Sequence, residues 1–327
     1  MSDAPQLSLF GGAAGPDPAG PGAVVTPAQR ALAARLSPRL HLGTSSWTFP
    51  GWAGLVYAGR PSKERLVDRG LEAYARHPLL RTVGVDRSYY ASLRAEEWRG
   101  YAAQLPEGFR VVAKATSEVT TAVFPDHPRL GARAGRPNPR FLDPRLALDE
   151  VARPYLAGLG DRAGPLVFAL PPIPPRRVPD ERGFALGLDR LLAAMPRELA
   201  VAVELRTPQL FTPRYLEVLA RRGASHVLNF WGAMPSLAEQ AALGADAVGA
   251  RVVLRLMLPP GADYEALKAR YAPFDRLAAP QPRMRTDALA IIRRAIDAAR
   301  DTFVIANNKA EGCAPLTLFA LAEALGA

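Results

Sequence analysis

The sequence predicts an α/β protein whose body is a (β/α)8 barrel of the TIM type. Short apolar runs rich in β-branched residues recur along the chain, and a helical segment follows each of them. This alternation requires parallel strand pairing through crossover helices. Eight such repeats in about 290 residues fit a closed barrel. A doubly wound open sheet is the alternative, but no Gly-x-Gly-x-x-Gly motif follows the first strand to support it.

The expected strands are short and mostly apolar, as the buried strands of a parallel sheet are. They cover residues 39–45, 81–88, 109–114, 165–170, 199–206, 225–230, 251–256 and 303–306. In the fifth of them Ala200, Ala202 and Glu204 share one face, while Val201 and Val203 share the other. Small residues facing inward and branched residues facing outward are typical of a barrel wall packed against helices.

Helical segments are expected after the strands, and several carry start signals. Ser62 is a good N-cap residue, and Pro315 suits a first helical turn because its missing N–H would have no partner there. The expected helices cover residues 62–76, 95–104, 145–159, 181–195, 213–222, 236–243, 263–271, 286–300 and the segment after Pro315. Residues 115–144 form a long proline-rich connection, and loops of this length are usually functional lids or mobile insertions.

The first 37 residues are rich in Ala, Gly and Pro, so we expect a flexible tail ahead of a barrel that spans residues 38–327. Within this tail, the sequence Gln6-Leu7-Ser8-Leu9-Phe10 resembles the pentapeptide by which bacterial replication and repair proteins bind the DNA sliding clamp. Leu7, Leu9 and Phe10 would be the apolar anchors, and Gln6 would supply a hydrogen bond. The alternative is a chance run of apolar residues.

Composition indicates a cellular location but does not identify a binding partner. No apolar run approaches the ~20 residues of a membrane helix, and Cys313 is the one cysteine, so a reducing cytoplasm is the expected location. The net charge of +10 suggests nucleic-acid binding. However, 37 of the 41 basic residues are arginine, which also fits a general composition bias.

Charged and polar side chains gather at the C-terminal ends of the expected strands, which form the active face of a (β/α)8 barrel. Glu204 and Arg206 end the fifth strand on its inward face, about 7 Å apart along the strand. Lys114 ends the third strand, and Arg255 lies near the end of the seventh. Further candidate ligand-binding residues follow other strands: Trp47, Asp86, Tyr90, Asn307, Asn308, Lys309 and Glu311.

This arrangement predicts an anion-binding site. Burying several cations together is unfavourable unless anions offset them, and the carboxylates present offset only some of the charge. We expect Lys114, Arg206 and Arg255 to hold a phosphate or carboxylate group, which suits the planar fork of arginine. Glu204 is the candidate general acid or base, and Lys114 is a second catalytic candidate. The alternative is a structural ion-pair network that caps the barrel.

Other chemistry finds little support in the sequence. The four histidines, at positions 41, 77, 127 and 226, show no metal-ligand spacing, so neither a metal nor a cofactor is expected. His41 lies at a strand start, where packing is its expected role. Cys313 has no histidine near it in sequence and is not expected to act as a nucleophile.

Six segments together resemble the YecE-like family, the domain of unknown function numbered 72. They are HLGTSSWTFPGW, TVGVDRSYY, FRVVAKAT, GPLVFALPP, AVELRTP and NNKAEGCAP, within residues 41–315. The resemblance implies a TIM-type barrel and no settled activity. The family more often has Glu-Ile-Asn where this chain has Gly84-Val85-Asp86, so a carboxylate at position 84 is excluded and Asp86 is its candidate substitute. The long proline-rich connection indicates a separate subgroup.

Two hypotheses of function follow. In the first, the protein is an enzyme, a hydrolase or lyase acting on a phosphate-bearing substrate, with nucleic acid as one such ligand. In the second, it is a non-catalytic module that binds an anionic group or nucleic acid and is recruited to the sliding clamp by its N-terminal peptide. An ion or ligand found in the barrel mouth of a purified sample would best separate them.

Overall fold

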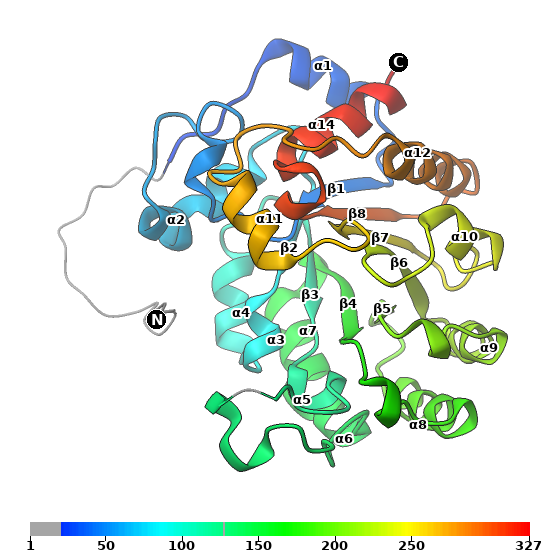
Figure 1. Cartoon of the computed structure of the whole chain (residues 1–327). Coiled ribbons are helices and arrows are strands. Elements are labelled where there is room, and N and C mark those ends of the chain that lie inside the picture. Colours follow the sequence, from blue (N-terminus) through cyan, green and yellow to red (C-terminus); the bar gives the residue numbers. More distant parts are fainter. Residues whose placement is uncertain (1–20, 127) are drawn as a thin grey trace.

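The structure, a computed structural model, describes residues 21–126 and 128–327. Within these residues, eight parallel strands form a closed barrel in the order of the sequence (Figure 1). The strands are β1 (Leu40–Thr44), β2 (Thr82–Val85), β3 (Arg110–Lys114), β4 (Ala163–Leu170), β5 (Val201–Leu205), β6 (Ser225–Trp231), β7 (Val252–Leu258) and β8 (Thr302–Ala306). The expected (β/α)8 fold is confirmed, and an open sheet is excluded because β8 pairs with β1 along the whole of both strands.

Helices surround the barrel and join successive strands. The longer ones are α2 (Lys63–Ala75), α4 (Ala95–Ala102), α7 (Arg153–Leu159), α8 (Glu181–Ala193), α9 (Pro213–Arg222), α10 (Leu237–Ala242), α11 (Tyr264–Tyr271), α12 (Pro282–Asp297) and α14 (Ala314–Leu325). Short helices lie in the connections: α3 (Arg87–Tyr90), α5 (Ser117–Thr120), α6 (Pro144–Leu146) and α13 (Asn308–Glu311). The Ser62 side chain accepts a hydrogen bond from the Arg65 amide, which confirms it as the N-cap of α2.

The core has an inner and an outer part. The outer part packs the strands against the helices, and the inner part fills the barrel with Val112, Val167, Ala169, Ala202, Val227, Val253, Phe303 and Ile305. Ala202 belongs to the inner part and Val203 to the outer, which confirms the two faces expected for this strand. Packed apolar side chains therefore fill the barrel directly below its C-terminal mouth.

Residues 21–37 differ from the flexible tail that the composition suggested. Helix α1 (Pro27–Arg35) begins with a capping box in which Thr26 and Gln29 exchange hydrogen bonds, and Leu32 is buried. The Arg35 side chain donates to the carbonyl of Gly326, so α1 lies beside α14 (Figure 1). The barrel unit thus begins before residue 38, because this alanine-rich segment has an apolar side to bury. Residues 1–20 lie outside the described part of the chain.

The long connection after β3 has structure of its own. An isolated bridge pairs Val123 with Pro137, and the buried Asn138 side chain donates to the carbonyls of Glu118 and Thr121 at 2.8 Å each. These bonds fold the connection back on itself over the C-terminal ends of β3 and β4.

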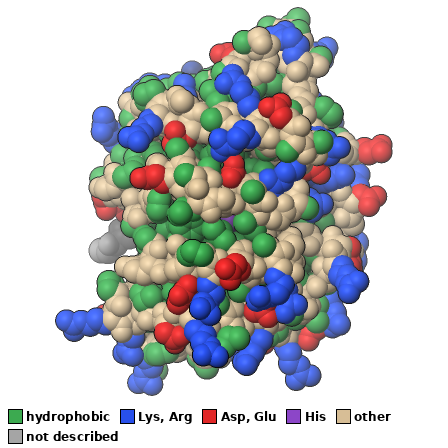
Figure 2. Space-filling view, turned by 90° about the vertical axis from the view of Figure 1, so that its right-hand side faces the viewer, with side chains coloured by type: hydrophobic (Ala, Val, Ile, Leu, Met, Phe, Trp, Pro, Cys, Tyr) green, Lys and Arg blue, Asp and Glu red, His purple; other side chains and the backbone are tan. Residues whose placement is uncertain are grey.

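The basic residues are spread over the surface. Figure 2 shows Lys and Arg side chains across the face formed by the helices on the right of Figure 1, with Asp and Glu side chains among them. Asp189, for example, pairs with both Arg221 and Arg222. In the described residues, no helix is both long enough and apolar enough to cross a membrane.

Candidate functional site

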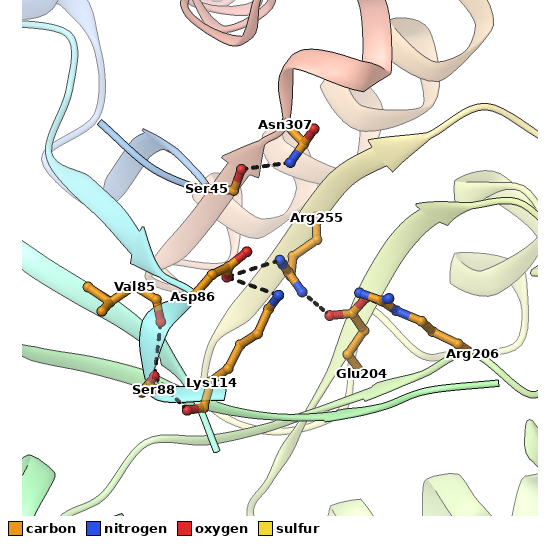
Figure 3. A network of polar contacts seen from close by, with 9 residues as sticks. All are labelled: Ser45, Val85, Asp86, Ser88, Lys114, Glu204, Arg206, Arg255 and Asn307. Atoms are coloured by element: carbon orange, nitrogen blue, oxygen red, sulfur yellow. Dashed lines mark hydrogen bonds and ion pairs between the residues drawn. The ribbon is translucent and has the colours of Figure 1, made fainter. Parts of the chain in front are cut away.

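Three charged side chains lie at the C-terminal mouth of the barrel, directly beyond its apolar interior (Figure 3). Lys114, Glu204 and Arg255 each follow a member of the inner core by two residues, so the strand pleat points them the same way. They come from β3, β5 and β7. The alternate strands of the barrel thus bring to one place residues that lie far apart in sequence.

Glu204 is the fully buried centre of this network, with no exposed surface. Its Oε1 accepts a hydrogen bond from Arg206 Nε at 2.7 Å, and its Oε2 accepts one from Arg255 Nη1. Burial alone would raise the pKa of this carboxyl, but Arg206, Arg255 and Lys114 outweigh that effect and hold the pKa well below its usual range. Glu204 is therefore ionised and holds two arginines in place, which disfavours a role as proton donor.

Asp86 is the second carboxylate of the network. It follows β2, and its Oδ1 lies 2.9 Å from Lys114 Nζ and 3.8 Å from Arg255 Nη2. Ser88, two residues later, donates to the carbonyls of Val85 and Lys114, so the ends of β2 and β3 are held together at this point. Asp86, which the sequence predicted as a ligand-binding residue, thus lies within the network.

Lys114 is the group in the network whose protonation is most finely balanced. Its side chain is 14% exposed. Burial, Arg255 and Arg206 lower the pKa of Lys114 to about 8, against the opposing pull of Asp86 and Glu204. The amine can therefore gain or lose a proton near neutral pH, which suits acid–base or nucleophilic chemistry.

Two aromatic rings flank the cations. The guanidinium carbon of Arg206 lies 4.0 Å from the centre of the Trp231 ring, and Lys114 Nζ lies 5.7 Å from that of Tyr89. Sequence reasoning missed Trp231 as a site residue. The signal was present, because Trp231 directly follows a predicted strand and shares the inward face of Val227 by alternation.

The charges of the network do not cancel. Lys114, Arg206 and Arg255 carry three positive charges, whereas Asp86 and Glu204 carry two negative ones. Beside them on β6, the Oδ1 atom of the buried Asn229 has no hydrogen-bond partner among the described residues. The mouth thus has one more positive than negative charge to offer a ligand.

Comparisons with known proteins place this barrel in a family. The family described as "Protein of unknown function DUF72" matches residues 41–327. The chain belongs to the DUF72 family. Among curated proteins, none matches the sequence.

Solved structures of DUF72 proteins show the same fold. A DUF72 protein of Enterococcus faecalis is 16% identical with a TM-score of 0.58, over 88% of this chain and 96% of the other. A DUF72 protein of Thermotoga maritima is 14% identical with a TM-score of 0.58, over 88% of this chain and 99% of the other. At this identity the likeness concerns the fold.

The turn after β8 adds polar groups to the mouth of this DUF72 barrel. Asn307 Nδ2 donates to Ser45 Oγ at 2.9 Å, which joins the ends of β8 and β1 (Figure 3). Asn308 is buried, and its Oδ1 accepts from the Ala314 amide at 2.8 Å. Asn308 therefore shapes the turn and is not placed to bind a ligand through this oxygen.

Lys309 is a mostly buried cation held by aromatic rings. Its Nζ lies 3.9 Å from the centre of the Tyr264 ring and 6.0 Å from that of Phe274. Its overall exposure is 7%. No signal in the sequence pointed to Tyr264, because α11 reaches the mouth from outside the run of strand ends.

Two of the expected ligand-binding residues have other roles. Glu311 is fully buried and accepts two bonds from Arg285 Nε and one from Nη2, at 2.9–3.0 Å, so it anchors α12 and cannot offset charge in the mouth. Trp47 is 8% exposed, and its Nε1 donates to the Leu66 carbonyl, which makes it largely structural. Tyr90, in contrast, is 78% exposed at the rim.

The remaining candidates lie elsewhere. Gln6, Leu7, Leu9 and Phe10 fall outside the described residues. Within residues 21–126 and 128–327, no group of three or more His, Cys, Asp or Glu side chains is placed to hold a metal ion. Cys313 is buried, and burial raises the pKa of its thiol to about 12, so it is a poor nucleophile.

Proposed function

We propose that this DUF72 barrel is an enzyme that binds the phosphate or other anionic group of a small ligand in its C-terminal mouth. The observation that carries the proposal is the buried network in which three cations share two carboxylates. The excess charge needs an anion, and the mouth of a (β/α)8 barrel is where such enzymes bind their substrates.

The arginines are prepared for this role. Glu204 and Trp231 hold the Arg206 guanidinium between an ion pair and a ring face. Arg255 is fixed by Glu204 on one side and faces Asp86 on the other. Donors held in place before the ligand arrives lose little freedom on binding and stabilise charge that develops during a reaction.

Lys114 is the residue best suited to chemistry. A pKa of about 8 leaves both its forms accessible near neutral pH, whereas Glu204 stays ionised. The reaction would be proton transfer or amine attack on a phosphate-bearing substrate, as in a hydrolase or lyase. Glu204 acts in this scheme as a positioning residue for the two arginines.

A melting assay tests anion binding. Inorganic phosphate should raise the melting temperature by several degrees, because a hundredfold excess over Kd stabilises the folded state by about 2.7 kcal/mol. In Arg206→Ala the shift should disappear, while Arg255 still pairs with Glu204 and keeps the fold intact.

Arg221→Ala is the matched control, because it removes a surface arginine whose partner Asp189 keeps Arg222. This variant should respond to phosphate as the wild type does. If neither phosphate nor any phosphate ester shifts the wild-type melting temperature, the anion-binding proposal is wrong.

A second candidate function is a binding module recruited to the DNA sliding clamp by residues 6–10. The supporting observation is the position of residues 22–24. The Val24 amide donates to the Val56 carbonyl, and the Ala58 amide donates to the Gly22 carbonyl. Val56 and Ala58 belong to the connection between β1 and α2, which follows the C-terminal end of β1 on the same side of the barrel as the site. Eleven residues from Phe10 to Pro21 span at most about 40 Å, so a bound clamp would lie near the barrel mouth.

Deletion of residues 1–10 tests the second candidate. Clamp binding at micromolar affinity should be lost, while the melting temperature stays unchanged because a chain terminus generally contributes little to the core. Equal clamp binding by the full chain and the deletion variant would make the pentapeptide a coincidence.

A further inference from the structure

A cavity of about 680 Å³ lies beside the charged network, between the β1–α2 connection, α2 and the α3–α4 region. Its size is within the range of small-molecule sites in enzymes. The arginines and the lysine of the network do not line it. We call this cavity the side groove.

The side groove adjoins the network at two shared residues. Asp86 lines the groove and also pairs with Lys114 and faces Arg255. Ser45 lines it too, and its hydroxyl accepts from Asn307 at the mouth. A ligand whose anionic group is held at the network and whose body lies in the groove would pass Asp86 and Ser45.

Aromatic rings form part of the groove wall. Trp47, Tyr90 and Tyr101 line it, and Trp47 packs edge-on against Tyr101 with ring centres 5.7 Å apart. Tyr90 is fixed against Tyr89 but is 78% exposed, so its ring is available to a ligand. Such rings provide flat apolar surfaces beside polar groups.

The groove wall carries paired charges. Its lining includes five carboxylates and three guanidinium groups, and the carboxylates have cationic partners: Asp68 pairs with Arg69, Glu72 with Arg76, Asp86 with Lys114 and Glu96 with Arg99. Arg87 is held by Glu97 at 2.8 Å. Carboxylates accept hydrogen bonds from hydroxyl groups, and an ion-paired carboxylate keeps lone pairs free for this.

We propose that the ligand of this barrel is a polyhydroxylated compound with one anionic terminus, such as a sugar phosphate or a sugar acid. This inference rests on the proposed function, because the network holds the anionic terminus. The hydroxyl-bearing body lies in the side groove, where the carboxylates and Arg87 bind the hydroxyls and Tyr90 covers the ring face. A polyanion running through the groove is disfavoured, because the three arginines that line it are each already paired with a carboxylate.

Calorimetric titration of the full chain tests this assignment. The probes are inorganic phosphate, a panel of pentose and hexose phosphates, the corresponding sugar carboxylates, and a short 5′-phosphorylated single-stranded oligonucleotide. At least one sugar phosphate or sugar carboxylate should bind about tenfold more tightly than inorganic phosphate, and the stronger of the two classes identifies the anionic group.

Tyr90→Ala isolates the groove, because this exposed side chain contributes little to the fold. It should weaken binding of the sugar derivative about threefold to tenfold and leave inorganic phosphate unchanged. Leu243→Ala, at an exposed side chain just after α10, is the control and should change neither.

The outcomes separate the two proposals. If phosphate binds but no sugar derivative binds more tightly, the groove assignment is overturned and anion binding stands. If the oligonucleotide binds most tightly and Tyr90→Ala weakens it, the ligand is a polyanion and the assignment is wrong. If no anion binds, both proposals fall.

Discussion

Lys114 Nζ lies 2.9 Å from Asp86 Oδ1, and the same oxygen faces Arg255 Nη2 at 3.8 Å. One carboxylate is thus shared between two cations, so it cannot fully compensate either. Burial, the largest cause, and the neighbouring arginines lower the pKa of Lys114 to about 8, and Asp86 offsets only part of this effect. The charge of the mouth therefore changes within the range in which enzymes work.

Sulfate binding should weaken as the pH rises through about 8. Lys114 is cationic below its pKa and neutral above it, so the attraction for the anion falls with its proton. Sulfate is the better probe because, unlike phosphate, it keeps its charge over this range. Loss of one charge-assisted contact should lower its affinity about tenfold. Titration calorimetry at about pH 7 and about pH 9.5 measures the change.

Lys114→Arg is the control for this pH dependence. An arginine stays charged throughout, so the variant should bind sulfate with nearly the same affinity at both pH values. If the variant keeps the wild-type profile, another group is responsible for it.

Borohydride trapping tests whether Lys114 forms a Schiff base. The neutral amine would add to a carbonyl carbon of a sugar phosphate and release water, and borohydride would reduce the resulting imine to a stable secondary amine. Mass spectrometry should then find the adduct on the peptide with Lys114 and not on those with Lys63, Lys268 or Lys309. Absence of any adduct at Lys114 across the panel removes this role.

Glu204→Gln should destabilise the barrel and make it more responsive to phosphate. The change leaves Arg206 and Arg255 buried without their carboxylate, which costs about 3–5 kcal/mol of unfolding free energy. Phosphate can take the place of the lost charge, so it should raise the melting temperature of the variant more than that of the wild type.

Glu181→Gln provides the matched comparison in the same denaturation experiments. Its carboxylate pairs with Arg214 at 3.7 Å on the surface, where such pairs contribute about 1 kcal/mol or less. Equal stability of the Glu204→Gln variant and the wild type would show that the buried ion pairs do not hold the mouth together.

Glu311→Gln should separate stability from binding. Arg285 would lose the carboxylate that holds it, with a cost of about 3 kcal/mol in the free energy of unfolding. The affinity for phosphate should stay at the wild-type value, because Glu311 does not contact the network. A change in phosphate affinity without a loss of stability would show that Glu311 takes part in ligand binding.

The barrel itself follows from local patterns. Alternation of strands and helices specifies parallel pairing, and the two faces of residues 199–206 show which side lies inside. Since the C-terminal ends of parallel strands meet at one edge of the barrel, the sequence predicts that Lys114, Glu204 and Arg255 lie close together. The sequence does not show which carboxylate pairs with which cation, because these side chains reach across the mouth from strands that are not neighbours.

The failures have physical causes. Glu311 follows β8 as a site residue would, but α13 turns it toward Arg285, which lies 26 residues earlier and gives no local signal. The alanine-rich composition around α1 suggested a flexible tail, although Thr26, Pro27 and Gln29 form the start signal of a helix. The side groove depends on how α2 and α4 are spaced, which no single stretch of sequence encodes.

The contact between Arg35 and the carbonyl of Gly326 brings the two ends of the barrel unit together at 2.8 Å. The chain could therefore start at a different strand while the strands keep their order around the barrel. A linker of about eight residues could join Ala327 to the start of α1, and new ends could be opened in the exposed stretch at residues 131–135. In such a circular permutant β4 would come first and β3 last, and the fold could close only when its two ends met beside Lys114.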